Sequence, residues 1–460
     1  MKKISTYLLL LALMLGSCKK TLDINKDPNN PIDVQESLLL APIELNVSDQ
    51  VYAGNASLDI QNFMQTIAAN QPNPGLWNYQ LFNSDFDSDW YNFYVNLLNN
   101  LKIMNAKAEA DGKLNYAGIS KILSAYTLGS ATDFWGDIPY SQALKGSDNF
   151  LPVYDKQEDI YKDVQTLLDN GIADINKNSI TKPAGDDYFY NGDMSKWLKL
   201  AYILKARFYM HLTKAPGHTA VQQADLALAA LANGMQSNDD DFKFVYAGTA
   251  GSENTINLTF SPVTTYVLNE TYVNGFKTRN DPRLTILVKP ADGTGLYTGR
   301  RIGTNTGALN EYSYPGDFYG SATAANYIVN YSEALFLKAE ATFIKSGAAA
   351  AQSIYQDGIK SNMSKVGVAN AAVTTYLAAR GTLTGANAIQ MIMEEKTVAS
   401  FFNFETFNDW RRTGFPAVTK VDGALTEIPR RLLYPESEIQ TNAQPQQSAK
   451  ATDRVWWDAQ

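Results

Sequence analysis

The segment from Gln71 to Gln80 combines residue types that bind sugars in proteins. It reads Gln-Pro-Asn-Pro-Gly-Leu-Trp-Asn-Tyr-Gln, so that two aromatic residues, Trp77 and Tyr79, are each followed by an amide side chain. Flat aromatic rings stack on the C–H faces of sugar rings, and amides bind their hydroxyl groups. Two prolines and a glycine predict an irregular loop. Trp77, Asn78 and Tyr79 are therefore candidate ligand-binding residues, with packing or a partner interface as the alternative.

A second aromatic cluster surrounds the turn at Pro315-Gly316. Its rings belong to Tyr312, Tyr314, Phe318 and Tyr319. Aromatic residues gathered on a glycine-containing turn offer another stacking platform, although packing into the interior would use the same residues. We take Tyr312, Tyr314 and Tyr319 as further candidate ligand-binding residues.

The sequence offers little for catalysis or metal binding. One Cys and two His in the whole chain exclude disulfide frameworks and Cys/His zinc sites, which need more of these residues. Glu394 and Glu395 form the most tempting carboxylate pair, but adjacent helix positions point about 100° apart and do not face each other across a substrate. The chain contains no phosphate-binding glycine loop and no Gly-x-Ser-x-Gly motif. We therefore expect a binding protein with no catalytic residues, no metal and no cofactor.

Length and composition predict a large folded protein that does not bind nucleic acid. The chain has 460 residues, of which 45% are hydrophobic and 12% aromatic, enough for a large buried core. The formal net charge of −8 provides no basic surface for nucleic acid. DNA and RNA are therefore excluded as expected partners.

The single cysteine, Cys18, determines the expected cellular location. A positive Met-Lys-Lys start precedes an apolar stretch from Tyr7 to Leu15, and the small residues Gly16 and Ser17 lead directly to Cys18. This pattern is typical of a secretory signal peptide, and its small-residue end is similar to a bacterial lipobox. We predict that residues 1–17 are a signal peptide and that Cys18 carries lipid chains. The alternative is cleavage elsewhere, which would leave Cys18 a free thiol.

The sequence after Cys18 predicts a tether followed by one large domain. Residues 18–35 are polar and rich in turn formers, as expected of a link between a lipid anchor and a folded domain. No later stretch is long and apolar enough to span a bilayer. We therefore expect an anchored protein with a single domain over residues 36–460.

Helical periodicity dominates this domain. Apolar residues recur every three or four positions, and short glycine-containing connections separate several of the predicted helices. The expected helices lie at about 90–104, 114–128, 158–175, 197–212, 219–231, 331–344 and 348–359. We expect the third of these to begin at a capping box formed by Asp155 and Glu158. Small residues such as Ala224 and Ala227 predict closely packed helix pairs similar to tetratricopeptide repeats.

A long insertion interrupts the helical pattern at about residues 236–330. It is rich in Gly, Thr, Asn and Tyr, and only short alternating runs such as 257–260 and 284–288 indicate strands. Insertions of this length inside a compact domain are usually functional or partly disordered. We therefore predict an all-α fold of tetratricopeptide-like helix pairs with irregular loop insertions and a few short strands.

Several motifs are spread in order along nearly the whole chain. In addition to Cys18 and its Leu-Asp-Ile-Asn-Lys-Asp-Pro-Asn tether, they include Asp-Phe-Trp-Gly-Asp-Ile-Pro-Tyr at 133–140, Pro-Val-Tyr-Asp at 152–155 and Asp-Pro-Arg-Leu at 281–284. Together these motifs resemble the SusD/RagB family of outer-membrane lipoproteins. The segments at 333–341, 403–412 and 428–435 are similar to the SusD-like branch.

The resemblance implies an α-helical protein on the outside of the outer membrane. Members of the family act as hinged lids on a SusC-like, TonB-dependent β-barrel transporter, and they capture an oligosaccharide or, in some relatives, a peptide for import. The Lys-Lys-Thr-Leu sequence after Cys18 differs from the acidic cluster that often accompanies surface export. An anchor that faces the periplasm therefore remains the alternative location.

Two other classes of function stay open at this level. Helical scaffolds also carry glycosidases, so a membrane-anchored all-α glycan hydrolase is one alternative. A tetratricopeptide-like scaffold with only protein partners is the other. Ligand identity stays open too, because aromatic rings on loops bind sugars and peptides equally well.

Overall fold

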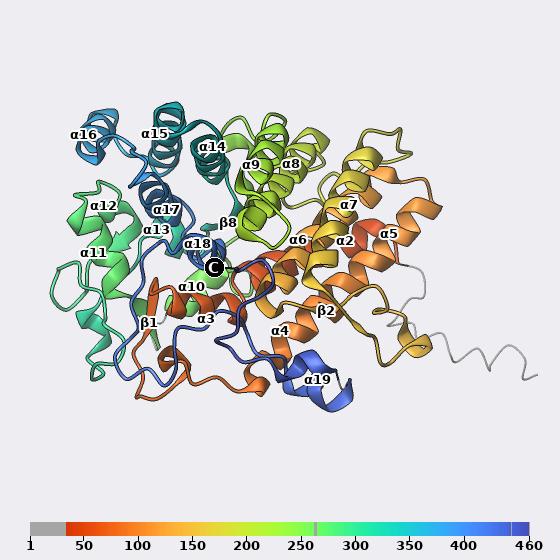
Figure 1. Cartoon of the computed structure of the whole chain (residues 1–460), viewed down its shortest axis with the longest axis horizontal. Helices are drawn as coiled ribbons and strands as arrows, with labels where there is room; N and C mark the ends of the chain where they lie inside the picture. The colour runs from red at the N-terminus through yellow and green to blue at the C-terminus, as the bar shows by residue number, and fades with distance from the viewer. Residues whose placement is uncertain (1–33, 262–264, 443, 460) are drawn as a thin grey trace, which may run out of the picture.

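The computed structural model describes residues 34–261, 265–442 and 444–459, and it is predominantly α-helical (Figure 1). Cys18, the predicted signal peptide and most of the predicted tether lie outside the described residues. Within those ranges, no helix combines the length and the apolar character needed to cross a membrane.

Helices stacked in chain order form the scaffold. Each helix packs against the next along the chain, and α14 continues the series from α9. Figure 1 shows this series as an arc from α5 to α15. Its members are α5 (Asn100–Ala110), α6 (Leu114–Trp135), α7 (Gln157–Ile175), α8 (Met194–His211), α9 (Ala220–Leu231), α14 (Tyr331–Ser346) and α15 (Ala348–Lys365). The predicted tetratricopeptide-like pairs and the all-α fold class are confirmed.

Small residues let these paired helices approach closely. A Cβ atom on Gly118 of α6 would lie 2.9 Å from the carbonyl oxygen of Gly171 on α7, closer than real Cβ atoms come to backbone. In α9, the buried residues include Ala224 and Ala227, whose short side chains face the neighbouring helices as predicted. Close helix contact increases dispersion and excludes water, which stabilises the stack.

The remaining helices frame the scaffold. They are α2 (Glu36–Asn46), η1 (Val47–Tyr52), α3 (Asn55–Phe63), η2 (Leu76–Asn78), η3 (Asn83–Phe86), α4 (Asp87–Tyr91), η4 (Asn92–Asn99), η5 (Gly146–Asp148), η6 (Leu212–Lys214), η7 (Asn238–Asp240), α10 (Thr255–Phe260), α11 (Glu270–Thr278), α12 (Leu284–Leu287), η8 (Leu309–Glu311), α13 (Asp317–Gly320), α16 (Asn370–Arg380), α17 (Ala388–Ala399), α18 (Glu405–Thr413), α19 (Glu436–Thr441) and η9 (Pro445–Ser448).

Short strands pair far-separated segments into antiparallel two-stranded sheets. The pairs are β1 (Ile67–Ala69) with β5 (Tyr266–Leu268), β2 (Ile138–Pro139) with β3 (Tyr154–Asp155), β4 (Phe242–Val245) with β8 (Ala325–Val329), and β6 (Val288–Lys289) with β7 (Tyr314–Pro315). Three of the four pairs involve the 236–330 segment, so sheet hydrogen bonds tie this segment to the scaffold and to itself.

Two predicted strands in this segment are wrong. Residues 257–260 lie in helix α10, because the Asn254 side chain accepts a hydrogen bond from the Asn257 amide and caps the helix. Residues 284–287 form α12, and only Val288 continues into a strand. Alternating polarity over four or five residues does not distinguish a strand from a single helical turn.

The predicted capping box of α7 is also wrong. The helix begins at Gln157 after Lys156, which makes no side-chain cap. The Asp155 carboxylate instead accepts hydrogen bonds from the amides of Tyr140 and Ser141, at 2.8 Å and 2.7 Å. Asp155 therefore holds the 140–141 turn rather than the start of a helix.

We expect Asp89→Asn to change the pH dependence of stability. Asp89 is buried in α4, where its Oδ1 accepts a 3.0 Å hydrogen bond from the Ala56 amide, and burial raises its pKa to about 6. The folded state therefore binds this proton more tightly than the unfolded state. As a result, stability falls as pH rises between about 4 and 6. The asparagine removes a loss of about 3 kcal/mol at pH 7.

Urea unfolding at pH 4 and pH 7 checks this prediction. The variant should gain stability over the parent at pH 7 and little at pH 4. Asp317→Asn, at an exposed carboxylate on α13, is the matched control. An equal effect of Asp89→Asn at both pH values would contradict the assignment of a raised pKa.

Candidate ligand-binding site

The two predicted aromatic segments meet in space. Trp77 from the 71–80 loop and Tyr312 from the second cluster are both partly buried and pack against one small apolar cluster. Its buried members are Ala68, Val267, Ile302 and Tyr314. Strands β1 and β5 supply the first two of these, and their antiparallel pairing brings the distant segments together. The result is one surface with two partly exposed aromatic rings.

The Trp77 indole lies over Gly75. A Cβ atom on Gly75 would lie only 2.4 Å from a carbon of the indole ring, so the ring occupies the space that any other side chain would fill. The indole Nε1 donates a 3.1 Å hydrogen bond to Oδ1 of Asn73. Glycine and asparagine together set the position of the ring before any ligand arrives, which reduces the entropy lost on binding.

Gly75→Ala should therefore weaken ligand binding without unfolding the protein. The added methyl group displaces the indole, while the extended backbone at Gly75 accepts alanine without strain. We expect a severalfold loss of affinity in titration calorimetry and an unchanged melting temperature. Gly185→Ala, where an added Cβ meets nothing within 4 Å, is the control. Unchanged affinity in Gly75→Ala would show that the indole position does not matter.

Asn70 and Arg300 hold the other side of this surface. Asn70 Nδ2 donates to the Gly307 carbonyl at 2.7 Å, and its Oδ1 accepts from Arg300 Nε at 2.9 Å. Arg300 is fully buried and has no carboxylate partner among the described residues, and burial lowers its pKa. These two residues position the loop that carries Tyr312. Sequence reasoning missed them, because neither lies in a motif or beside an aromatic residue.

A polar hollow of about 270 Å³ adjoins the aromatic surface. Ile302 and Val421 line it and also belong to the apolar cluster or pack against it. The polar side of the hollow contains Gln65, Glu270 and Thr271. Aromatic rings beside carboxylate, amide and hydroxyl groups match the two kinds of surface that an oligosaccharide presents.

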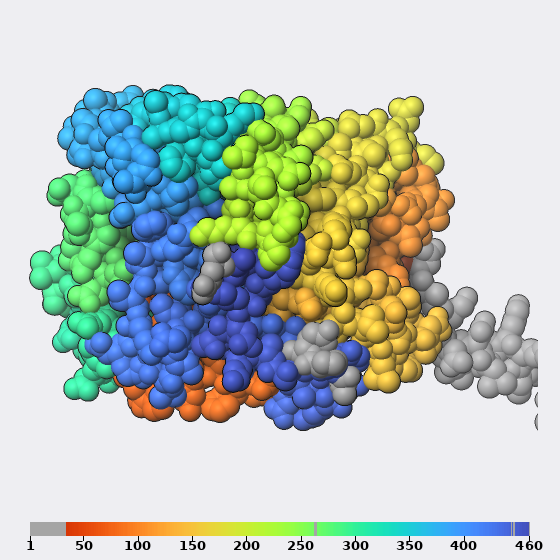
Figure 2. Space-filling model, in the orientation of Figure 1, coloured from red at the N-terminus to blue at the C-terminus, as the bar shows by residue number. Residues whose placement is uncertain are grey.

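Two of the candidate ligand-binding residues, Asn78 and Tyr79, are buried, as the packing alternative expects. Asn78 is fully buried, and its Nδ2 donates to the Asp422 carbonyl at 3.0 Å, while its own carbonyl accepts from the Leu425 amide. Tyr79 has a positive φ of 66°, and its ring packs edge-on against Phe63. These contacts join the 71–80 loop to the 420–425 segment, and Figure 2 shows C-terminal residues in blue above the orange segment at the lower edge. Asn78 and Tyr79 position the loop instead of presenting surfaces to solvent.

Tyr314 and Tyr319 are likewise interior. The Tyr314 hydroxyl donates a 2.5 Å hydrogen bond to the Leu309 carbonyl, and only 8% of the residue is exposed. Tyr319 is 2% exposed and packs against Phe401 at a ring distance of 4.9 Å. The strand β7 and the helix α13 turn both rings toward the core, which fits the packing alternative for these two candidates. Of the six predicted residues, only Trp77 and Tyr312 are partly exposed, and the other four are buried.

A buried polar network lies in the scaffold, away from this surface. Asp133, His211 and Glu405 offer donor atoms within 4.8 Å of one another, a spacing that a metal ion could use. Other side chains of the protein already bind these three groups. Asp133 accepts hydrogen bonds from Tyr161 and Trp457, and Glu405 binds His211 at 2.9 Å. Arg207 and His211 outweigh the effect of burial and hold the pKa of Glu405 below its ordinary value. The arrangement favours a structural network over a metal site.

The adjacent carboxylates Glu394 and Glu395 form ion pairs outside the candidate site. Glu395 is fully buried and binds Arg283 at 2.6 Å, whereas Glu394 binds Arg380 at 2.8 Å. Both side chains are held by arginines, and neither belongs to the aromatic surface or its polar hollow. The site has the features of a binding surface.

A stack of helix pairs that presents loops with aromatic residues defines a class of helical binding proteins. The sequence matches, over residues 28–435, a SusD-like family described as "Starch-binding associating with outer membrane". The chain belongs to this SusD-like family, which confirms the resemblance in its motifs. No curated protein sequence matches the chain significantly.

Solved structures show the same fold. A chitin-binding protein shares 25% identity with a TM-score of 0.78, and the match covers 93% of this chain and 100% of that one. A SusD/RagB family protein from Bacteroides thetaiotaomicron shares 20% identity with a TM-score of 0.80 and coverages of 93% and 99%. A chitin-binding SusD homolog from Flavobacterium johnsoniae shares 22% identity, with a TM-score of 0.77 and coverages of 92% and 98%.

Proposed function

We propose that this protein is a surface-anchored nutrient-binding lipoprotein that captures an oligosaccharide and closes as a lid on a TonB-dependent, SusC-like outer-membrane transporter. The observation that carries the proposal is the meeting of Trp77 and Tyr312 on one surface beside the polar hollow. Family membership and the lipobox-like sequence at Cys18 support the location and the partner. Peptide capture is the alternative for the same surface.

Titration calorimetry with oligosaccharides and short peptides tests the proposed capture. Chitooligosaccharides come first, because two structural relatives are named as chitin-binding. We expect one ligand class to bind, and chromatography of the incubated ligand to show no shorter products. Product release would favour a hydrolase, and failure of every ligand to bind would favour a protein-interaction scaffold.

Membrane attachment and partnership need separate tests. Cys18→Ala should release the protein from the outer-membrane fraction, because a multi-chain lipid anchor holds a domain stably whereas the bare chain has none. Protease treatment of intact cells distinguishes a surface-facing anchor from a periplasmic one. Co-purification of a TonB-dependent barrel with the anchored protein would support the lid role, and its absence under mild extraction would contradict that role.

A further inference from the structure

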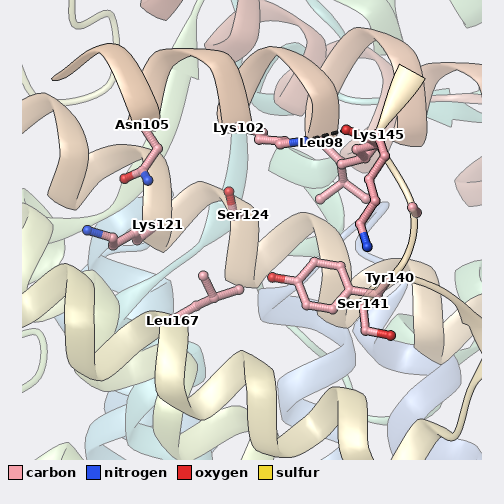
Figure 3. A pocket seen from close by; sticks show the side chains of 11 residues that line it. Leu98, Lys102, Asn105, Lys121, Ser124, Tyr140, Ser141, Lys145 and Leu167 are labelled. Carbon is pink, nitrogen blue, oxygen red and sulfur yellow. Dashed lines mark hydrogen bonds between the residues drawn. The ribbon is translucent and has the colours of Figure 1, made fainter. Parts of the chain in front are cut away.

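A separate cavity of about 390 Å³ lies between helices α5, α6 and α7 and the 140–145 segment (Figure 3). Figure 1 places these helices at the end of the molecule opposite β1 and α11, which border the proposed oligosaccharide surface. The two sites therefore use different parts of the fold. A cavity of this size holds a small molecule rather than a few waters.

The walls of the cavity are mostly apolar. Leu98 comes from η4, Leu167 from α7, and Leu144 from the connecting segment, while the Tyr140 ring closes one side. Figure 3 shows the Tyr140 hydroxyl directed between Leu167 and Ser124. That hydroxyl has no hydrogen-bond partner among the described residues, and burial raises the pKa of Tyr140 to about 12. A neutral hydroxyl is therefore available to donate a hydrogen bond inside an apolar cavity.

Three lysines and no carboxylates line the same cavity. Lys121 is already paired, because its ammonium binds Glu109 at 2.6 Å and also Asp174. Lys102 donates to the Leu144 carbonyl and has no carboxylate partner in the described part of the chain. The Lys145 ammonium has no hydrogen-bond or ion-pair partner in that part of the chain either, and Figure 3 shows it on the side of Tyr140. One end of the cavity thus carries two uncompensated positive charges in an acidic protein.

The wall that carries these charges is held in place. Leu144 has a φ of 58°, a left-handed conformation that costs a leucine about 1 kcal/mol or more. The Lys102 bond to its carbonyl helps to hold this conformation, and Asp155 fixes the preceding turn through Tyr140 and Ser141. Backbone strain of this kind persists where the surroundings over-determine it, as in ligand clamps.

We propose that this cavity binds an amphiphilic anion, with its charged head at Lys102 and Lys145 and its apolar body against Leu98, Leu144, Leu167 and the Tyr140 ring. A carboxylate or phosphate head accepts charge-assisted hydrogen bonds from the two ammonium groups. Each buried methylene of the body contributes roughly 0.8 kcal/mol. Medium-chain fatty acids and alkyl phosphates both combine an anionic head with an apolar chain. Comparing a carboxylate probe with a phosphate probe distinguishes these two classes of ligand.

Titration calorimetry with the purified protein tests the proposal, using probes below their micellar concentrations. Decanoate and decyl phosphate carry both the charge and the apolar body, decyl maltoside lacks the charge, and inorganic phosphate lacks the body. We expect at least one of the first two to bind with a one-to-one ratio, at least tenfold more tightly than decyl maltoside or inorganic phosphate. The tighter of the two identifies the head that the cavity prefers.

Substitutions of residues that line the cavity test whether the probe binds there. The double substitution Lys102→Gln and Lys145→Gln should weaken the preferred probe at least tenfold, whereas Lys182→Gln, at an exposed lysine outside the cavity, should leave it unchanged. Leu167→Glu, which places a carboxylate in the apolar wall, should also reduce binding at least tenfold, with thermal melting to confirm folding. Failure of both anionic amphiphiles to bind, or equal binding in the double variant, would overturn the proposal.

Discussion

Arg283→Met is expected to destabilise the protein by about 3 to 5 kcal/mol, because it leaves the buried Asp281 carboxylate without its ion-pair partner and removes one of the two arginines that bind the buried Glu395. Arg283 is fully buried and binds Asp281 and Glu395, each at 2.6 Å. Burial alone would raise the pKa of Asp281, but the guanidinium outweighs it and holds this pKa below its ordinary value. The arginine therefore keeps the Asp281 carboxylate ionised inside the core.

The position of Arg283 explains why the effect should be large. It lies between α11 and α12 of the long insertion, while Glu395 belongs to α17 and a further partner, Asn362, belongs to α15. Loss of the guanidinium thus removes buried polar contacts that join the insertion to α15 and α17. Urea unfolding measures the change, and Lys277→Met, at an exposed lysine of α11, is the control for loss of positive charge. A loss below about 1 kcal/mol would contradict the role assigned to this ion pair.

Trp77→Ala is expected to weaken ligand binding by about tenfold to a hundredfold, which corresponds to roughly 1.4 to 2.8 kcal/mol. The indole is only partly buried, so its removal takes away a stacking surface without opening a cavity in the core. Trp77→Phe keeps a smaller ring and should lose less affinity. Tyr312→Ala should weaken binding too, because both rings contact the same apolar cluster.

Titration calorimetry with the best ligand of the panel measures these changes, and thermal melting confirms that the variants stay folded. Tyr91→Ala removes an aromatic residue that is 56% exposed on α4, outside the candidate surface, and serves as the control. Equal affinity of Trp77→Ala and the parent would exclude Trp77 from the binding site. That result would leave the family and the fold untouched.

The helix stack could be predicted because its signals are local. Apolar periodicity and small residues lie within each helix, so α8, α9 and α14 could be located within a few residues. The strand pairs could not be predicted in this way. Ile67 pairs with Leu268, and nothing in either short segment indicates its distant partner. In α10, one capping side chain from Asn254 outweighed an alternating pattern.

The candidate site was predicted in part, for a similar reason. Residue type and loop composition pointed to Trp77 and Tyr312, which are both partly exposed. The direction of a side chain depends on backbone conformation, and the positive φ of Tyr79 places its ring inside. Asn70 and Arg300 act through contacts with residues far along the chain, so only the folded structure reveals them.

The contact between Asp133 and Trp457 has a consequence for how the protein is made. The indole Nε1 donates a 3.0 Å hydrogen bond to Asp133, from a position 324 residues later in the sequence. Arg411 also stacks on this indole, with 4.5 Å between the guanidinium carbon and the ring centre. A ribosome that has made only the first helix pairs has not yet supplied these partners. Completion of the scaffold must therefore follow synthesis of the C-terminal segment.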